Sequence, residues 1–271
     1  MFASWSLLSV ALLCPSIITG LGYLRELPSG TAVYGSVLKT MIVEDVLDCA
    51  EEWYDSTILA INYNIAEKKC EGFSELFGAN NEAQGVASYL FTKGEESICS
   101  MDVSADFNKL VTCRKEWFPL TVKGVMYCYY LMSSAEYNKT ISTLYDIVFA
   151  CKKLYPFSDS ASIHSAEEEN ALVNHAVISS ALSKLTLRGI VIGMHLTLDN
   201  YDNYNDGTKW VWVDNSPVTY TNWNSTYGCP YCNDPGRWCT YAMMSTSNVG
   251  WYQCDTKTRR PLLCKYQVEN L

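Results

Sequence analysis

The cysteines constrain this chain more than any other residue type. The 271 residues contain 12 cysteines, and all of them except Cys14 lie at or beyond Cys49. Residues 2–20 carry no charge and include the short apolar run 5–13. We interpret residues 1–20 as a secretory signal peptide that is cleaved near Gly20 or Gly22. In an exported chain, cysteines form disulfides more often than they bind metal ions. We therefore expect a secreted, extracellular protein that is stabilised by disulfides.

An odd number of cysteines follows the predicted signal peptide, because 12 cysteines minus Cys14 leaves 11. One of them is therefore free, buried or paired with a second chain, and the last arrangement would give a covalent dimer. The sequons at Asn138 and Asn224 predict N-glycosylation in the same compartment.

The charge balance excludes two classes of partner. The formal net charge is −9, whereas binding to nucleic acid or to an anionic membrane surface needs clustered Lys and Arg. Beyond residue 20, no stretch approaches the roughly 20 apolar residues of a membrane span. We therefore expect neither a nucleic-acid partner nor a membrane-spanning segment.

Residues 31–112 show a mixed pattern of short elements. Val46, Cys49, Ala50 and Trp53 fall on one face of a short helix. Strands are predicted at 34–37, 41–43, 58–63 and 70–73. A module of this size is expected to need its cross-links.

Three stretches of this first region resemble the CW/PAN-type module of secreted roundworm proteins. They are Asp-Cys at 48–49, Leu-Ala-Ile-Asn-Tyr at 59–63 and Cys-Glu-Gly-Phe at 70–73. Two further family cysteines, near Trp53 and Thr57, are absent together, as expected after loss of one whole disulfide. The resemblance implies a PAN/apple-like α+β module over residues 31–112, with Cys49 and Cys70 among the disulfide cysteines. The partner of the odd cysteine, among Cys49, Cys70 and Cys99, stays open.

Two helices and a series of strands are predicted after Cys113. Ser165-x-x-Glu168 is a capping box that opens the second helix. One face of the first helix carries Leu144, Ile147, Val148, Cys151 and Leu154, and that of the second carries Leu172, Val173, Ala176, Val177 and Ala181. A strand is expected at 189–196. A hairpin follows, from 210–213 through a turn at 214–217 into 218–220. Later strands are expected near 238–244 and 249–254, and the last one ends at Cys264.

Five stretches of this second region resemble the C-type lectin-like domain. They are Ala-Ser-Ile-His-Ser-Ala-Glu-Glu-Glu-Asn at 161–170, Val-Ile-Gly-Met at 191–194, Trp210-x-Trp212-x-Asp214 with Trp223, Gly250-Trp251, and Pro-Leu-Leu-Cys at 261–264. The resemblance covers residues 113–267 and implies an α+β fold with two helices, antiparallel sheets and a long loop. It also implies the disulfides Cys151–Cys264, Cys239–Cys254 and Cys113–Cys128.

Sugar binding in this family uses a calcium ion, held by Glu-Pro-Asn or Gln-Pro-Asp in the long loop and by Trp-Asn-Asp on a later strand. Here the two triplets align with Cys229-Pro230-Tyr231 and Trp251-Tyr252-Gln253, so most oxygen ligands are missing and Gln253 alone offers an amide oxygen. An acidic group in the loop does not have the ligand spacing of an EF-hand: Asp199, Asp202, Asp206 and Asp214. We expect no metal cofactor, with an atypical calcium site as the alternative.

The other reactive residue types favour structural roles over catalysis. Cys229 and Cys232 form a C-x-x-C pair without the strand and helix N-terminus that a redox dithiol needs. A structural disulfide, either local or a bridge toward the N-terminal module, is preferred to a disulfide oxidoreductase and to a zinc site that includes Cys239. The three histidines, His164, His175 and His195, share no motif with a nucleophile, and the glutamates at 167–169 are interpreted as a helix first turn. We predict that the protein is not an enzyme.

Tyrosines concentrated in the long loop carry the functional prediction. Tyrosine supplies contact area at low entropic cost and keeps a polar tip, as at binding surfaces. We predict a recognition protein that binds a glycan or protein through this loop without calcium, and the family implies host-defence (innate-immune) or matrix recognition. The alternatives are a calcium-dependent lectin with atypical ligands and a disulfide oxidoreductase. The predicted ligand-binding residues are Tyr201, Tyr204, Asp206, Tyr227, Tyr231, Tyr252 and Gln253.

Overall fold

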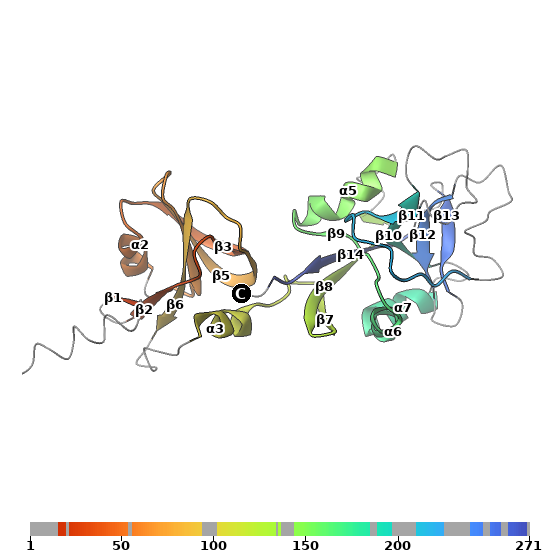
Figure 1. Ribbon diagram of the computed structural model, residues 1–271, viewed down its shortest axis with the longest axis horizontal. Coiled ribbons are helices and arrows are strands. Elements are labelled where there is room, and N and C mark those ends of the chain that lie inside the picture. The colour runs from red at the N-terminus through yellow and green to blue at the C-terminus, as the bar shows by residue number, and fades with distance from the viewer. Residues whose placement is uncertain are drawn as a thin grey trace, which may run out of the picture. The chain divides into compact units, whose positions relative to one another are not determined.

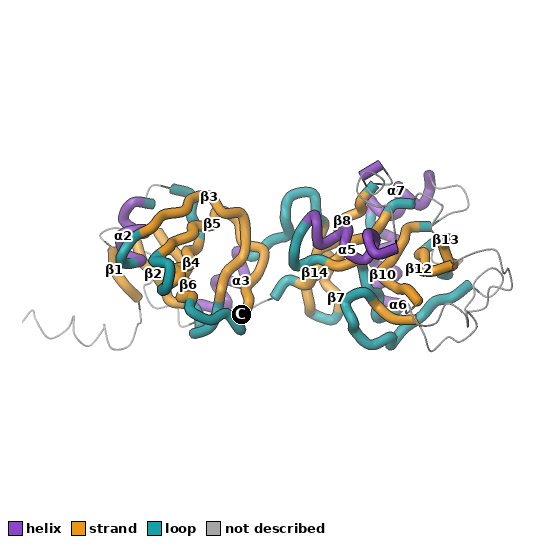
Figure 2. The backbone as a smooth tube through the Cα atoms, turned by 90° about the horizontal axis from the view of Figure 1, so that it is seen from above, coloured by secondary structure: helices purple, strands orange, loops and turns teal. Residues whose placement is uncertain are grey.

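A computed structural model describes residues 16–19, 22–53, 56–93, 102–133, 135–136, 144–184, 189–196, 210–224, 239–245, 250–255 and 260–269. The chain divides into two compact units, residues 1–115 with 268–271, and residues 116–267. Figure 1 labels their elements and Figure 2 distinguishes helices from strands. None of the helices in the described part of the chain is long and apolar enough to cross a membrane.

In the first unit, the described strands form one antiparallel sheet in the order β1-β2-β6-β4-β5-β3. Asp45 and Asp102 cap its helices, because their side chains accept hydrogen bonds from the backbone N–H groups of Leu47 and Ala105. The elements are β1 Ser16–Thr19, β2 Gly22–Glu26, β3 Ala32–Ile42, α2 Val46–Glu52, β4 Ala60–Asn64, β5 Lys69–Asn80, β6 Val86–Lys93 and α3 Val103–Leu110.

A disulfide between Cys49 and Cys70 ties α2 to β5. Around it lies an apolar cluster that includes Trp53 and Ile58. Gly72 makes this packing feasible, because a Cβ atom there would lie 2.4 Å from Ile58 Cδ1 and 2.8 Å from Trp53 Cζ3. Cys49 and Cys70 are therefore partners of each other. The assignment of this unit to the CW/PAN family stays a prediction.

The predicted strands at 34–37 and 41–43 are wrong in their division, because both belong to the single strand β3. β3 lies at the edge of the sheet and pairs with β5 alone. Register shifts between Tyr34 and Lys39 interrupt the alternation of buried and exposed residues. The alternation of apolar and polar residues is therefore interrupted in the sequence although the strand itself is continuous.

Strand β1 lies within the predicted signal peptide and pairs with β2. Cleavage near Gly20 would remove β1, while β2 would keep its pairing with β6 along residues 22–26. The signal peptide itself stays a prediction.

In the second unit, the main sheet has the strand order β13-β12-β10-β14-β8-β7, with β11 on β10 and β9 on β14. The described pairings between named strands are antiparallel except that of β10 with β14, and an isolated bridge between Trp223 and Trp251 is also parallel. The α+β class and the order of these elements agree with the predicted C-type lectin-like fold. The elements are β7 Phe118–Val122, β8 Val125–Met132, α5 Leu144–Leu154, β9 Asp159–Ser160, α6 Ala166–Asn174, α7 Ala176–Lys184, β10 Ile190–Leu196, β11 Trp210–Trp212, β12 Cys239–Met244, β13 Tyr252–Asp255 and β14 Leu262–Gln267.

The bridge Cys151–Cys264 joins α5 to β14, as the resemblance implied, and both cysteines are fully buried. Cys113 and Cys128 are each disulfide-bonded. Cys229 and Cys232 lie outside the described residues. For Cys239 in β12 and Cys254 in β13, the structure describes the backbone but not the side chain.

The predicted second helix is wrong as one continuous element, because it divides at His175 into α6 and α7. The backbone of His175 is extended, and its ring stacks on Phe118 of β7 with the centroids 3.9 Å apart. The break turns the apolar face of α7, so Ile178 and Leu182 are buried whereas Val177 of the predicted stripe is exposed.

The predicted tryptophan hairpin is also wrong. β11 pairs with β10, Trp212 opposite Met194, and residues 218–220 form no strand. Trp210 and Trp212 are both buried, whereas Val211 is half-buried. A turn follows the tryptophans, but over residues 212–215 instead of 214–217: the Asn215 N–H donates to the Trp212 carbonyl oxygen at 3.0 Å. Asn215 adopts a left-handed backbone with φ of 59°.

Removing both partners of Cys151–Cys264 should destabilise the second unit more than removing Cys49–Cys70 destabilises the first. The sequence separations are 113 and 21, and loop-closure entropy gives about 4.7 kcal/mol for a 100-residue loop and about 3 kcal/mol for a 15-residue loop. Urea unfolding of the two Cys→Ser double variants, followed by tryptophan fluorescence, measures the difference. Equal losses of unfolding free energy would contradict the ordering.

Candidate functional site

Most of the predicted ligand-binding residues lie outside the described part of the chain: Tyr201, Tyr204, Asp206, Tyr227 and Tyr231. Tyr252 is half-buried against a cluster that contains Cys151 and Val191, and its hydroxyl accepts a hydrogen bond from Asn224 Nδ2 at 3.5 Å. The backbone of Gln253 pairs with Ala242. The structure thus ties Tyr252 to the core, and the binding role of all these residues stays a prediction, as does glycosylation at Asn138 and Asn224.

Residues 210–224 separate the two groups of predicted ligand-binding tyrosines, and the structure anchors this segment to the core. The indole rings of Trp210 and Trp223 lie 4.9 Å apart between centroids, and Trp251 contacts both Trp212 and Trp223 at 5.9 and 5.8 Å. The Asn224 N–H donates to the Trp251 carbonyl oxygen. The four tryptophans therefore form one connected aromatic cluster.

Gly250 permits the close approach of this segment to Trp251. Its φ of +76° is a left-handed conformation, and a Cβ atom would lie 2.6 Å from the Asn222 carbonyl oxygen. Because an L side chain would be strained in that conformation and would collide, glycine is required here.

The carboxylate of Glu169 holds the same segment to α6. Glu169 is only 2% exposed, and it accepts hydrogen bonds from Trp251 Nε1 at 2.8 Å and from the Tyr220 hydroxyl at 2.6 Å. Asn222 Nδ2 donates to both carboxylate oxygens, at 3.2 and 3.1 Å. A buried carboxylate is tolerated only when donors saturate it, so Glu169 fixes where residues 220–222 and 251 lie.

The neighbouring Glu168 makes a second buried network. Its Oε1 atom lies 2.6 Å from Lys265 Nζ of β14 and 2.6 Å from the Tyr129 hydroxyl of β8. Lys265 Nζ also donates to the Ser162 carbonyl oxygen at 2.8 Å. Burial lowers the pKa of Lys265 and the Glu168 carboxylate opposes that shift, whereas burial and Glu168 together raise the pKa of Tyr129 well above its usual value.

The predicted capping box is present in a modified form. Ser165 Oγ accepts from the Glu168 N–H at 3.2 Å, as expected. Glu168 Oε2 accepts from the His164 N–H at 2.9 Å instead of from the Ser165 N–H.

The sequence indicated the cap, but it gave no sign that Glu168 and Glu169 are buried, because glutamates in the first turn of a helix are usually solvated. The charged Lys265, directly after the apolar residues 261–264, was an available signal.

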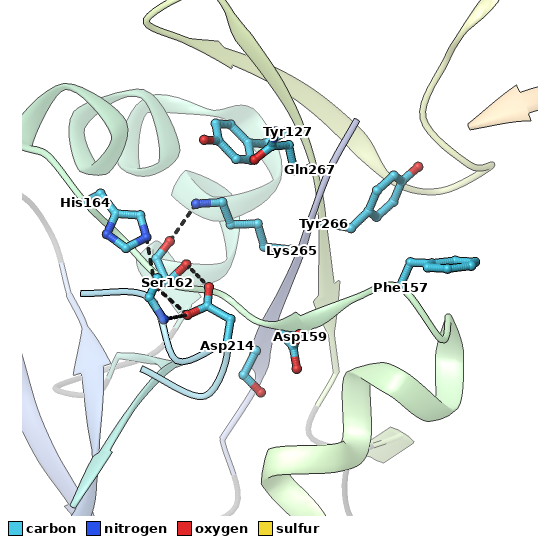
Figure 3. A pocket seen from close by; sticks show the side chains of 11 residues that line it. Tyr127, Phe157, Asp159, Ser162, His164, Asp214, Lys265, Tyr266 and Gln267 are labelled. Carbon is cyan, nitrogen blue, oxygen red and sulfur yellow. Dashed lines mark hydrogen bonds between the residues drawn. The ribbon is translucent and has the colours of Figure 1, made fainter. Parts of the chain in front are cut away.

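A polar pocket of about 260 Å³ lies beside β14. Figure 3 shows His164, Ser162 and Asp214 converging on one side of it, with Phe157 and Tyr266 on the other. The lining residues are Tyr127, Phe157, Asp159, Ser160, Ser162, His164, Asp214, Ser216, Lys265, Tyr266 and Gln267.

Asp214 is a hydrogen-bonded acceptor in this pocket. Its Oδ2 accepts from Ser162 Oγ at 2.6 Å, and its Oδ1 accepts from the Ser216 N–H at 2.9 Å and from the Ser216 hydroxyl. Burial alone would raise the pKa of Asp214, but the hydrogen bonds from Ser162 and Ser216 and the nearby His164 outweigh it, so the pKa is lowered. Within the described residues, no group of three His, Cys, Asp or Glu side chains could hold a metal ion.

His164, Ser216 and Asp214 adjoin one another in an order that does not suit nucleophilic catalysis. Ser216 Oγ lies 3.2 Å from His164 Nε2 and donates its single proton to Asp214. His164 Nε2 must then carry a proton and act as the donor, which is the reverse of a general base acting on the hydroxyl. Burial, and then the charge of Lys265, lower the pKa of His164. The three residues therefore form a polar surface fixed by hydrogen bonds.

Comparison with solved structures gives matches to C-type lectin-like proteins. The EPNH mutant of CEL-I is 22% identical, covering 57% of this chain and 96% of that one, with a TM-score of 0.39. A calcium-independent type II antifreeze protein is 18% identical over 58% and 95%, with a TM-score of 0.37. The human scavenger receptor C-type lectin carbohydrate-recognition domain is 16% identical over 58% and 99%, with a TM-score of 0.36. No protein-family model and no curated protein matches this chain.

Replacing Glu169 by Ala should lower the free energy of unfolding of the second unit by at least about 2 kcal/mol, because it leaves the buried Trp251 Nε1–H and its neighbours without an acceptor. Glu167→Ala is the matched control: the same residue type in the same helical turn, exposed, and expected to cost less than about 1 kcal/mol. Chemical denaturation followed by tryptophan fluorescence compares the two. Similar losses would show that the Glu169 network is not stabilising.

Asp214→Asn should reduce the loss of stability in acid. Because the folded-state pKa of Asp214 is lowered, its contribution is present above its unfolded pKa and is lost as the pH falls through the folded value. The stability difference between the native chain and the variant should therefore shrink between about pH 5 and pH 2. Asp159 is a control with the opposite expectation, because burial raises the pKa of its carboxyl group although Lys152 acts to lower it. Asp159→Asn should therefore make the loss of folding stability at low pH steeper. Thermal melting as a function of pH measures both variants.

Proposed function

We propose that this chain is a secreted recognition protein that binds a glycan or protein ligand through the long loop of its C-type lectin-like unit, residues 197–238, without calcium. It is not an enzyme, and its setting is extracellular recognition of the host-defence kind. The observation that carries the proposal is the anchoring of residues 210–224 to the core by Glu169 and the tryptophan cluster. That segment fixes the chain between the two tyrosine-bearing parts of the loop.

Anchoring of this kind favours binding because it limits the entropy that a loop loses when it meets a ligand. The tyrosines at 201, 204, 227 and 231 add large contact surfaces, each with only two side-chain torsions to order. Together these features support a recognition surface carried by a fixed base.

Binding without calcium is supported by the sequence of the two triplets that the family uses for the ion. Cys229-Pro230-Tyr231 and Trp251-Tyr252-Gln253 lack the carboxylates that hard Ca²⁺ requires. Trp251 has no side-chain oxygen and is fully buried, and Tyr252 packs on the core; both observations support binding without calcium. A calcium-dependent lectin with atypical ligands is the alternative, and chelation distinguishes the two.

Replacing Tyr201, Tyr204, Tyr227 and Tyr231 together by Ser should reduce ligand capture on a glycan array and in extracellular protein screens by tenfold or more, a loss of roughly 1.4 kcal/mol. The variant should melt within a few degrees of the native chain, because residues 210–224 are unchanged. Capture by the native protein should be the same in calcium and in EDTA.

The control is Val177→Ser, a change at an exposed apolar position of α7 outside the long loop, which should leave capture intact. A shift of the melting temperature on adding EDTA would instead favour the calcium-dependent alternative, because a bound ion raises stability by mass action. Capture that survives the four tyrosine changes would contradict the proposed role of the loop.

A further inference from the structure

We propose that the polar pocket beside β14 is a second binding site, which takes a single hydroxylated ring such as one monosaccharide unit by direct hydrogen bonds. The site is built entirely from described residues and does not depend on the long-loop tyrosines. Its volume of about 260 Å³ is below the range of roughly 300–1,000 Å³ that holds drug-sized ligands, which suits a ligand of one ring.

The pocket offers a fixed acceptor for a hydroxyl group. Three donors hold the Asp214 carboxylate, two of them at Oδ1 and one at Oδ2. A carboxylate has about four lone-pair positions, so one position at Oδ2 is left for a ligand O–H. Because Ser162 and Ser216 already orient the carboxylate, binding a hydroxyl there costs little further ordering.

The charges of the pocket favour a neutral ligand. Lys265 lies 2.6 Å from Glu168, and Lys152 lies 3.1 Å from Asp159, so these four charges pair within the protein. The ammonium of Lys265 also lies over the Tyr127 ring, 4.2 Å from its centroid, where a cationic ligand would otherwise bind. An anionic ligand would meet Asp214 and Asp159. A ligand that both donates and accepts hydrogen bonds without net charge fits this arrangement best.

The pocket also presents an aromatic surface beside its polar groups. Phe157 lines the pocket and is 55% exposed. Exposure of an apolar phenyl ring to water is unfavourable. Phe157 makes a T-shaped contact with the Tyr155 ring, with the centroids 5.4 Å apart, and this contact helps to hold the Phe157 ring in place. A sugar ring has one face of C–H groups and an edge of hydroxyls, which suits a pocket whose lining includes both aromatic rings and the Asp214 carboxylate.

Ligand-observed saturation-transfer NMR on the intact oxidised chain tests the proposal. The probes are glucose, galactose, mannose, N-acetylglucosamine and myo-inositol at millimolar concentration in EDTA. At least one should receive saturation, and Phe157→Ala should weaken its binding about tenfold. Gln267→Ala, an exposed residue of the same lining, should weaken it less. Phe149→Ala removes another exposed ring outside the lining and should change nothing.

The four-tyrosine Ser variant separates this site from the long loop, since it should keep monosaccharide binding even where array capture is lost. Absence of saturation transfer to all five probes would overturn the proposal. Binding that is unchanged in both Phe157→Ala and Gln267→Ala would overturn it as well, because it would place the ligand elsewhere.

Discussion

Two adjacent buried carboxylates, Glu168 and Glu169, determine how the second unit is assembled. Neighbouring residues on a helix point about 100° apart, so α6 directs one carboxylate to β8 and β14 and the other to residues 220–222 and Trp251. Glu168 meets Lys265 and Tyr129, and Glu169 meets Tyr220, Asn222 and Trp251. A buried carboxylate without donors would be highly unfavourable, so any packing that separated these groups would be rejected. The two side chains thus select one arrangement of strands and loop.

The sequence predicted the elements that have local signals. Ser165 three residues before Glu168 indicated a helix N-terminus, and the N-cap hydrogen bond is present. Cysteine pairing followed from the family resemblance, and Cys151–Cys264 is bonded. The buried networks could not be predicted in the same way, because the side-chain partners of Glu168 and Glu169 lie 39 to 97 residues away in the chain. Nothing local distinguishes a first-turn glutamate that faces solvent from one that faces Lys265.

The errors in the prediction have a common physical origin, which is tertiary packing that overrides a local period. His175 continues the helical pattern of its neighbours, yet its ring stacks on Phe118 and the helix breaks there. Trp210 and Trp212 have the alternation of a hairpin strand, but β11 pairs with residues 194–196 of β10 instead of with residues 218–220. In the first unit, β3 has only one neighbour, and its register shifts conceal a single long strand. In each case the local sequence pattern is present, but contacts with residues distant in the sequence determine which structure forms.

Asp214 shows why the base of the loop and the polar pocket are physically one structure. It ends the turn after β11, whose tryptophans lie in the core, and its carboxylate is bonded to Ser162 just before α6. The same α6 supplies Glu169 to the other end of the segment through Tyr220 and Asn222. Residues 214 and 220–222 are therefore held by groups only a few positions apart, Ser162 and Glu169. Because both contacts arise from one short stretch of chain, the pocket wall is as well fixed as the loop base.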